Sequence, residues 1–196
     1  MRADSRRAAS TAATHQAIVD AARELLATRQ WREFTLDAVA KRAGVTRVTV
    51  YNQVRSKQGL LDAVLADVAQ HAGMDQLLTD TRDLTAADAR RFVIERTCRF
   101  WHAQRDVLRP LFGLAAVDRE VAATLARRER WRADQIHRLV LRLSATPPRE
   151  AFDRSTVVAG VIALTSFPTY DGLGPLADDP ARAAALIDHL VVSLTG

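Results

Sequence analysis

The sequence contains a single cysteine, Cys98, so an internal disulfide framework is excluded. A chain without disulfides suits a reducing compartment, and we expect a cytoplasmic protein. No apolar run approaches the roughly 18 residues that a membrane-spanning helix needs. The Arg-, Ser- and Ala-rich beginning also lacks the apolar core of a secretory signal. These absences indicate a protein without a membrane partner.

The motifs of the common enzyme classes are missing as well. The sequence has no glycine-rich phosphate loop, no GxSxG, no HExxH and no paired CxxC. The five histidines are scattered, without the spacing of metal ligands. We therefore expect no catalytic residues, no metal and no cofactor, and we predict that the protein is not an enzyme.

Glycine and proline are scarce, with 8 and 6 residues respectively, whereas 48% of the chain is hydrophobic. This composition is typical of a globular and mostly helical protein. Apolar residues recur at helical spacing along most of the chain, which predicts an all-α fold of about nine helices.

Positive charge is concentrated at the N-terminal end. Residues 1–57 hold 11 of the 28 Lys+Arg residues and 5 of the 23 Asp+Glu residues, by count a net charge of +6. The rest of the chain is close to neutral, since the whole chain carries +5. A local excess of positive charge indicates contact with nucleic acid.

The basic segment contains the stretch TLDAVAKRAGVTRVTVYNQVRSKQGLL, residues 35–61, which reads as three short helices with two tight joints. Thr35 and Thr46 are expected N-caps, and Ser56 is expected to cap the third helix. Gly44 is expected to end the first helix in a left-handed conformation. Two helices joined by a short turn with glycine form a helix-turn-helix, whose second helix enters the DNA major groove.

The same residues resemble the N-terminal domain of the Tet repressor family. The resemblance covers roughly residues 15–68 and rests on the pattern Ile18, Ala21, Ala22, Leu25 and Leu26, then FTLDAVAKRAGVTRVTVY, then RSKQGLLDAV. Val48, Gln53 and Val54 depart from the family, which often has Gly at position 48 and His-Phe at positions 53 and 54. The departures leave the fold in place but make the base preference of relatives a poor guide.

Candidate DNA contacts follow from the direction of the recognition helix. Arg47 offers two donors to guanine, and Val48 offers an apolar contact to a thymine methyl group. The resemblance implies that Tyr51 and Lys57 hold the phosphate backbone, and Lys57 also lies at a helix start, where phosphate is favoured. The predicted DNA-binding residues are Thr35, Thr46, Arg47, Val48, Thr49, Tyr51, Asn52, Gln53 and Lys57.

Three segments are predicted. Residues 1–14 are small, polar and basic without periodicity, and we expect a disordered basic arm. Residues 15–70 form the helix-turn-helix domain, whose last helix connects onward. Residues 71–196 form a helical domain, for which the resemblance implies effector binding and dimerisation.

An effector site is expected between helices of the C-terminal domain, where apolar walls carry a few polar groups. For each candidate residue the alternative is an ordinary place in the core. The candidates are Cys98, Trp101, His102, Phe112, Trp131, His137, Phe167 and Tyr170.

The last two helices carry more apolar surface than a single face needs. The resemblance implies that they pair with their two-fold mates as a four-helix bundle, while burial in the protein's own core remains the alternative. The predicted dimer-interface residues are Val157, Val158, Val161, Ile162, Ile187, Leu190, Val191 and Leu194.

These features predict a ligand-responsive transcriptional regulator, most readily a repressor, that binds a palindromic operator in double-stranded DNA as a homodimer. A small-molecule effector of unknown identity would release it. An activator is the alternative within the class. Outside the class, the alternative is a small-molecule-binding helical protein, or an enzyme, that retains the helix-turn-helix as a scaffold.

Overall fold

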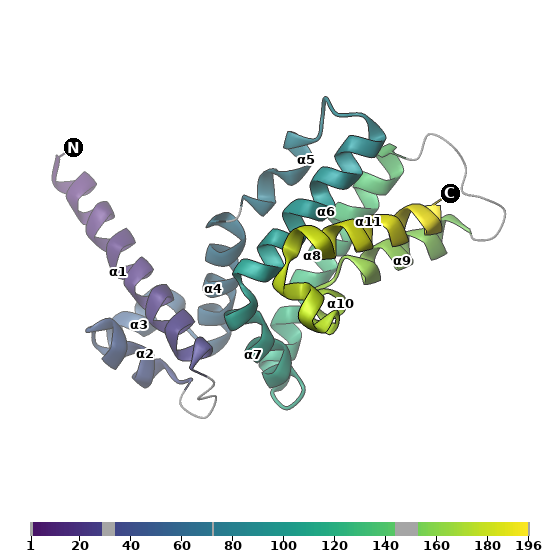
Figure 1. Ribbon diagram of the computed structural model, residues 1–196. Coiled ribbons are helices and arrows are strands. Elements are labelled where there is room, and N and C mark those ends of the chain that lie inside the picture. Colours follow the sequence, from purple (N-terminus) through teal and green to yellow (C-terminus); the bar gives the residue numbers. More distant parts are fainter. Residues whose placement is uncertain (1, 29–33, 72, 144–152, 196) are drawn as a thin grey trace. The chain divides into compact units, whose positions relative to one another are not determined.

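A computed structural model of the chain describes residues 2–28, 34–71, 73–143 and 153–195. It divides into two compact units. The first unit comprises Met1–His71 with Arg109–Leu125, and the second comprises Ala72–Leu108 with Ala126–Gly196. Every regular element among the described residues is helical (Figure 1), which confirms the all-α prediction.

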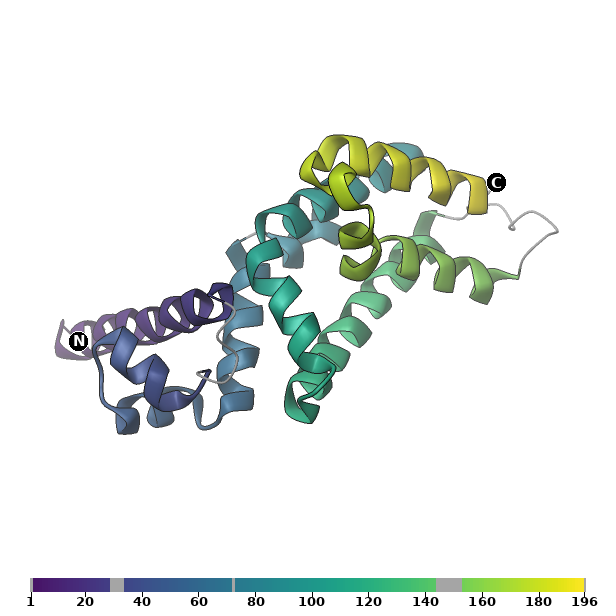
Figure 2. The ribbon, with the colours of Figure 1, turned by 60° about the horizontal axis from the view of Figure 1, so that its bottom comes forward.

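The N-terminal part of the first unit consists of α1 (Arg2–Ala27), α2 (Leu36–Ala43), α3 (Arg47–Val54) and α4 (Lys57–His71). α1 packs against α2 and α4, and α3 packs against both α2 and α4 (Figures 1 and 2). Their inward side chains form one apolar core, which includes Ile18, Leu26, Phe34, Val39, Val50, Leu60, Leu61 and Val64.

The ends of the short helices are fixed by the residues that the sequence predicted. The hydroxyl of Thr35 accepts the backbone N–H of Ala38, and the hydroxyl of Thr46 accepts that of Thr49. Gly44 ends α2 with φ at +66°, in the left-handed region that a residue without Cβ adopts at little cost. The turn between α2 and α3 is therefore determined locally.

The N-terminal residues differ from the prediction of a disordered arm. α1 begins at Arg2, so residues 2–14 form the first half of a continuous helix. The sequence from 2 to 27 contains neither glycine nor proline and is rich in alanine, so nothing stops the helix from extending backwards from its packed end. The absence of apolar periodicity reflected exposure, since the side chains of residues 8–13 are solvent-exposed.

A buried carboxylate joins α1 to α4. Asp67 accepts hydrogen bonds from Nε2 of Gln16 at 3.0 Å and from Nη1 of Arg23 at 2.8 Å, and Nδ1 of His71 lies 3.1 Å from it. A buried charge is tolerated when it is paired and hydrogen-bonded in this way. These contacts fix the angle at which the long first helix crosses α4.

The second unit contains η2 (Met74–Gln76), α5 (Leu77–Asp80), α6 (Ala86–Ala103), α9 (Arg154–Leu164), α10 (Phe167–Gly172), η3 (Gly174–Asp178) and α11 (Pro180–Thr195). α7 (Arg105–Ala115) and α8 (Arg119–Leu143) contribute residues to both units. α11 packs against α6 and α9, and its buried side chains include Ala184, Ile187 and Val191.

The helices α5 and α10 are short, with four and six residues. α10 begins at the N-cap Ser166, whose hydroxyl accepts the N–H of Thr169, and Pro168 occupies its first turn. Proline is well tolerated there, so the glycines and prolines of this segment begin and end short helices. Among the described residues, no helix is both long enough and apolar enough to cross a membrane.

Candidate nucleic-acid interface

The helix α3 exposes an apolar side chain and an aromatic ring that the fold does not use. Val50 and Val54 are buried against the core of the first unit. On the other side, Val48 is 68% exposed and Tyr51 is 52% exposed. Large side chains left in water on an otherwise well-packed helix are typical of a contact surface.

The predicted DNA contacts on α3 divide by exposure. Thr46, Arg47, Val48, Tyr51 and Asn52 are exposed, whereas Thr49 and Gln53 are half-buried. The hydroxyls of Thr46 and Thr49 lie 2.9 Å apart and hydrogen-bond to each other. The first turn therefore has a fixed arrangement of polar groups before any DNA arrives.

The two other predicted contacts lie at neighbouring helix starts in the same unit. Thr35 is exposed at the N-cap of α2, where its hydroxyl is engaged with the backbone. Lys57 is the first residue of α4 and is half-buried. Thr35, the exposed side of α3 and Lys57 all belong to the first unit, as a helix-turn-helix surface requires.

The joint between α3 and α4 is tight, and it fixes the position of Lys57. Arg55 has φ at +63°, an uncommon conformation for a residue with a side chain. The hydroxyl of Ser56 accepts the N–H of Gly59, as predicted for the cap of this helix. A Cβ on Gly59 would collide with the carbonyl oxygen of Val54, so this close approach requires glycine.

Lys57 has a partner that the sequence did not predict. Its Nζ lies 2.9 Å from Oδ2 of Asp118, a residue 61 positions further along the chain. The hydrogen bond from Lys57 is the main cause that holds the pKa of Asp118 below its usual range. Lys57 also lies over the ring of Phe34, with 6.0 Å between Nζ and the centroid. No local pattern indicates this pairing, because the two residues meet only through the tertiary fold.

In the second unit, part of the predicted effector site turns out to be packed core. Cys98, Trp101, Phe167 and Tyr170 are buried. The rings of Trp101 and Phe167 meet edge to face with centroids 5.6 Å apart, and the hydroxyl of Tyr170 donates to the carbonyl of Ala177. Burial raises the pKa of the Cys98 thiol and that of Tyr170 to about 12. These four side chains are packed in the interior of the second unit.

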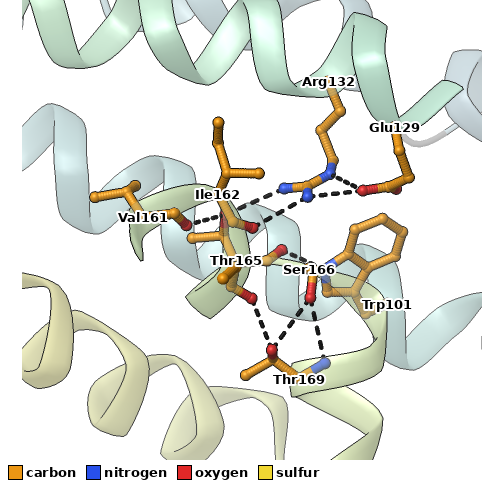
Figure 3. Close-up of polar contacts among 9 residues, drawn as sticks. Trp101, Glu129, Arg132, Val161, Ile162, Thr165, Ser166 and Thr169 are labelled. Atoms are coloured by element: carbon orange, nitrogen blue, oxygen red, sulfur yellow. Dashed lines mark hydrogen bonds and ion pairs between the residues drawn. The ribbon is translucent and has the colours of Figure 1, made fainter. Parts of the chain in front are cut away.

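Figure 3 shows the polar network beside this core. Nε1 of Trp101 donates to the carbonyl oxygen of Thr165, and Nη1 of Arg132 donates to the hydroxyl of Thr165. Arg132 also donates to the carbonyl oxygen of Ile162 and pairs with Glu129 at 2.8 Å. The end of α9 is thus held by α6 and α8 through fully paired groups. The sequence did not single out Arg132 or Thr165.

The other four effector candidates are more exposed than these buried side chains. Trp131 is 46% exposed on α8, and His137 on the same helix is also exposed. His102 is exposed, with its Nδ1 3.2 Å from the carbonyl oxygen of Ala177. Phe112 is half-buried and belongs to the first unit. His102 and Tyr170 thus contact the same carbonyl oxygen, and the effector site itself stays a prediction.

The predicted dimer-interface residues differ in how far they are buried within a single chain. Val157, Val158, Val161, Ile187 and Val191 are buried within a single chain, mainly because α11 packs on α6 and α9. Ile162 and Leu194 are half-buried, and Leu190 is exposed. α9 and α11 also expose apolar side chains that are not among the predicted interface residues. These include Ala159, Ala163, Leu186 and Val192.

A short capped turn, a buried inner face and an exposed outer face on the second helix define a DNA-binding helix-turn-helix domain. Residues 18–64 match the family model described as bacterial regulatory proteins, tetR family. These residues thus match the helix-turn-helix domain of that family, which confirms the resemblance found in the sequence.

Two curated relatives illustrate how far the similarity extends. The chain is 40% identical over 73 residues to the HTH-type transcriptional regulator AlkX of Mycobacterium tuberculosis. The aligned segment covers 34% of this chain and 35% of that protein. It is 44% identical over 59 residues to the HTH-type transcriptional regulator SrpR of Pseudomonas putida. This segment covers 30% of this chain and 28% of that protein. The chain therefore matches only about a third of the length of these relatives.

Solved structures resemble the whole fold. A TetR-family transcriptional regulator from Rhodococcus sp. superposes with a TM-score of 0.73 at 18% identity, covering 93% of this chain and 98% of that one. The structure of a SmeT–triclosan complex superposes with a TM-score of 0.68 at 20% identity, covering 92% and 90%. At these identities the likeness establishes the fold alone.

Proposed function

We propose that the protein is a homodimeric transcriptional repressor that binds a palindromic operator and is released by a small-molecule effector. The observation that carries the proposal is the exposed outer face of α3, where Val48 and Tyr51 stand in water beside Arg47. The positive charge of residues 1–57 supports the same function.

The groups on this face suit the readout of DNA. Arg47 would donate to O6 and N7 of a guanine, and Val48 would contact a thymine methyl group in the major groove. Tyr51 and Lys57 would bind phosphates, which position the protein without reading sequence. Thr35, Thr46, Thr49, Asn52 and Gln53 complete the proposed contact set.

A homodimer would give the operator its palindrome. Leu186 and Leu190, one turn apart, leave apolar surface exposed on α11, and Ala159 and Ala163, also one turn apart, leave small side chains exposed on α9. Small and apolar groups allow two such helix pairs to approach closely and bury this surface across a two-fold axis. Two recognition helices would then meet half-sites about one helical turn apart.

The effector would bind the second unit. The SmeT structure is a complex with triclosan, and by analogy we propose an apolar small molecule for this chain. Because Trp101 and Phe167 are buried against each other, we propose that the effector selects a rearranged state of this unit. It would release DNA only by binding that state more tightly than the DNA-bound state.

A repressor of this kind needs no catalytic chemistry, and the curated relatives carry the names of transcriptional regulators. We accordingly propose a non-enzymatic protein that works in the cytoplasm, where bacterial DNA lies. A reporter fused to the operator would separate repression from activation by the direction in which its expression changes when the protein is removed.

The test is selection of bound sequences from a random duplex pool at physiological salt. An enriched palindrome supports the proposal, gives the half-site spacing and supplies a probe for an effector screen. Binding that disappears with salt and enriches no sequence would overturn it, because a merely basic surface behaves in that way. The small-molecule-binding or enzymatic alternative would then be preferred.

A further inference from the structure

The ion pair between Lys57 and Asp118 lies where the proposed function places a phosphate contact. Oδ2 of Asp118 is 2.9 Å from Nζ of Lys57, and both residues belong to the first unit. The two side chains are 32% and 24% exposed, so the ion pair is only partly buried. A phosphate that approaches Lys57 therefore meets an ammonium group that already has an anionic partner.

Asp118 is not a freely moving surface carboxylate. Its Oδ1 accepts the backbone N–H groups of Glu120 and Val121 at 3.0 and 3.2 Å, which makes it the N-cap of α8. One oxygen thus anchors the carboxylate to the helix, and the other faces Lys57. Because it is anchored, the negative charge cannot swing away when a phosphate arrives.

We propose that Asp118 sets the DNA affinity of this protein by competing with the phosphate backbone for Lys57. The inference rests on the proposed DNA-binding function. Before DNA binds, the carboxylate compensates the charge of Lys57. In the complex, a phosphate would have to share this ammonium group with the carboxylate, which lowers the affinity for every DNA sequence alike.

The charge of Asp118 is not needed for the structure around it. Asparagine caps helices about as well as aspartate, so capping α8 requires only the side-chain oxygen. A partly exposed ion pair contributes little to stability. A charge that the fold hardly needs, fixed beside a DNA-contacting lysine, is suited to tuning affinity.

The experiment compares the full-length protein with D118N, which keeps the capping oxygen and removes the charge. Affinity for one mixed-sequence duplex is measured at low and at physiological salt. We expect D118N to raise the affinity for the duplex about two- to fivefold for each subunit that contacts DNA. This gain in affinity should shrink as the salt concentration rises. E120Q is the matched control, because it removes the same charge from an exposed position in the first turn of α8 that the ion pair does not involve.

A double-mutant cycle with K57M assigns the effect to this pair. We expect D118N to give no gain in the K57M background, because the carboxylate then has no ammonium group to withhold. A gain that persists without Lys57, or an equal gain in E120Q, would overturn the inference and indicate a general charge effect. Unchanged or weaker binding by D118N would overturn it too.

Two further observations keep these outcomes distinct. Thermal denaturation of D118N and of a second uncharged cap, D118S, shows whether α8 is intact, and both variants should gain affinity if the inference is right. If the wild-type protein and all variants fail to bind DNA, the proposed function itself is overturned. If the wild type binds and neither variant gains, only the role of Asp118 is overturned.

Discussion

Nη1 of Arg47 lies 3.3 Å from Oδ2 of Asp37, which joins the first turn of the recognition helix to the first turn of α2. Both side chains are well exposed. An exposed pair of this kind contributes at most about 1 kcal/mol. Arg47 is therefore held ready by a weak contact that a guanine with two acceptors can replace.

Replacing Arg47 by alanine tests this role. On the sequence selected by the protein, R47A is expected to lose about 1–3 kcal/mol of binding free energy and to relax the preference at one base pair. The measurement is a binding titration on the selected duplex and on single-base variants of it.

The matched control is R42A, because Arg42 lies on α2 and pairs with Glu24 in a similarly exposed contact. It removes the same charge without touching the recognition helix. If R47A loses the same affinity on selected and on unrelated DNA, Arg47 contacts phosphate and does not read a base.

Lys57 is expected to act on all sequences equally. K57M removes the ammonium group and keeps most of the side chain, so binding should weaken to the same extent on selected and unrelated duplexes. The slope of log K against log salt should flatten by about 0.9 for each subunit. A titration series over salt concentration gives this slope, and an unchanged slope would remove Lys57 from the phosphate contacts.

The features predicted correctly from the sequence are those that neighbouring residues determine. Thr35, Gly44 and Thr46 fix the helix-turn-helix through contacts within three or four positions, so their identities were sufficient. The pairing of Lys57 with Asp118 depends on how helices far apart in sequence pack. No local pattern encodes it.

The predicted dimer-interface residues show a second limit of prediction from sequence. Periodicity correctly marked Ile187 and Val191 as apolar positions of a packed face, but a pattern does not tell whether that face meets the same chain or a second one. In the structure these two are buried in their own chain, and the neighbouring face with Leu186 and Leu190 is the exposed one. Similarly, the lack of apolar periodicity in residues 8–13 predicts disorder, whereas in the structure it reflects exposure on a helix.

The exposed face of α11 gives a direct test of dimerisation. L190E places a charge at the centre of this apolar surface, and we expect the variant to become monomeric and to lose operator binding, because a charge buried across the interface has no partner. Light scattering coupled to size-exclusion chromatography measures the mass. L84E is the control, since Leu84 in the same unit is as exposed as Leu190, 40% against 39%, and lies before α6, outside α9 and α11. A dimer that survives L190E would show that another surface forms the interface.

Two glycines should respond in opposite directions to the same substitution. G59A is expected to cost about 1–3 kcal/mol of unfolding free energy, because the new methyl group meets the backbone oxygen of Val54. G113A should stabilise by about 0.5–1 kcal/mol, since Gly113 lies within α7 with nothing near its Cβ position. Thermal or denaturant unfolding compares the two, and a neutral G59A would contradict the tight α3–α4 joint.

The lone cysteine is expected to be chemically silent in the folded protein. Burial raises the pKa of the Cys98 thiol to about 12, so almost none of it is thiolate at pH 7 to 8. Because only the thiolate attacks thiol reagents, alkylation should be very slow until the protein unfolds and the pKa returns towards its ordinary value of 9.0. Mass spectrometry after timed labelling, with and without denaturant, measures both rates. Rapid labelling of the folded protein at neutral pH would instead place Cys98 within reach of oxidants and make a thiol sensor the better interpretation.

The raised pKa of Cys98 also predicts how stability depends on pH. Between pH 9 and 12 the folded state keeps a proton on this thiol that the unfolded chain releases. The free energy of unfolding should therefore fall over that range, and C98A should reduce the fall.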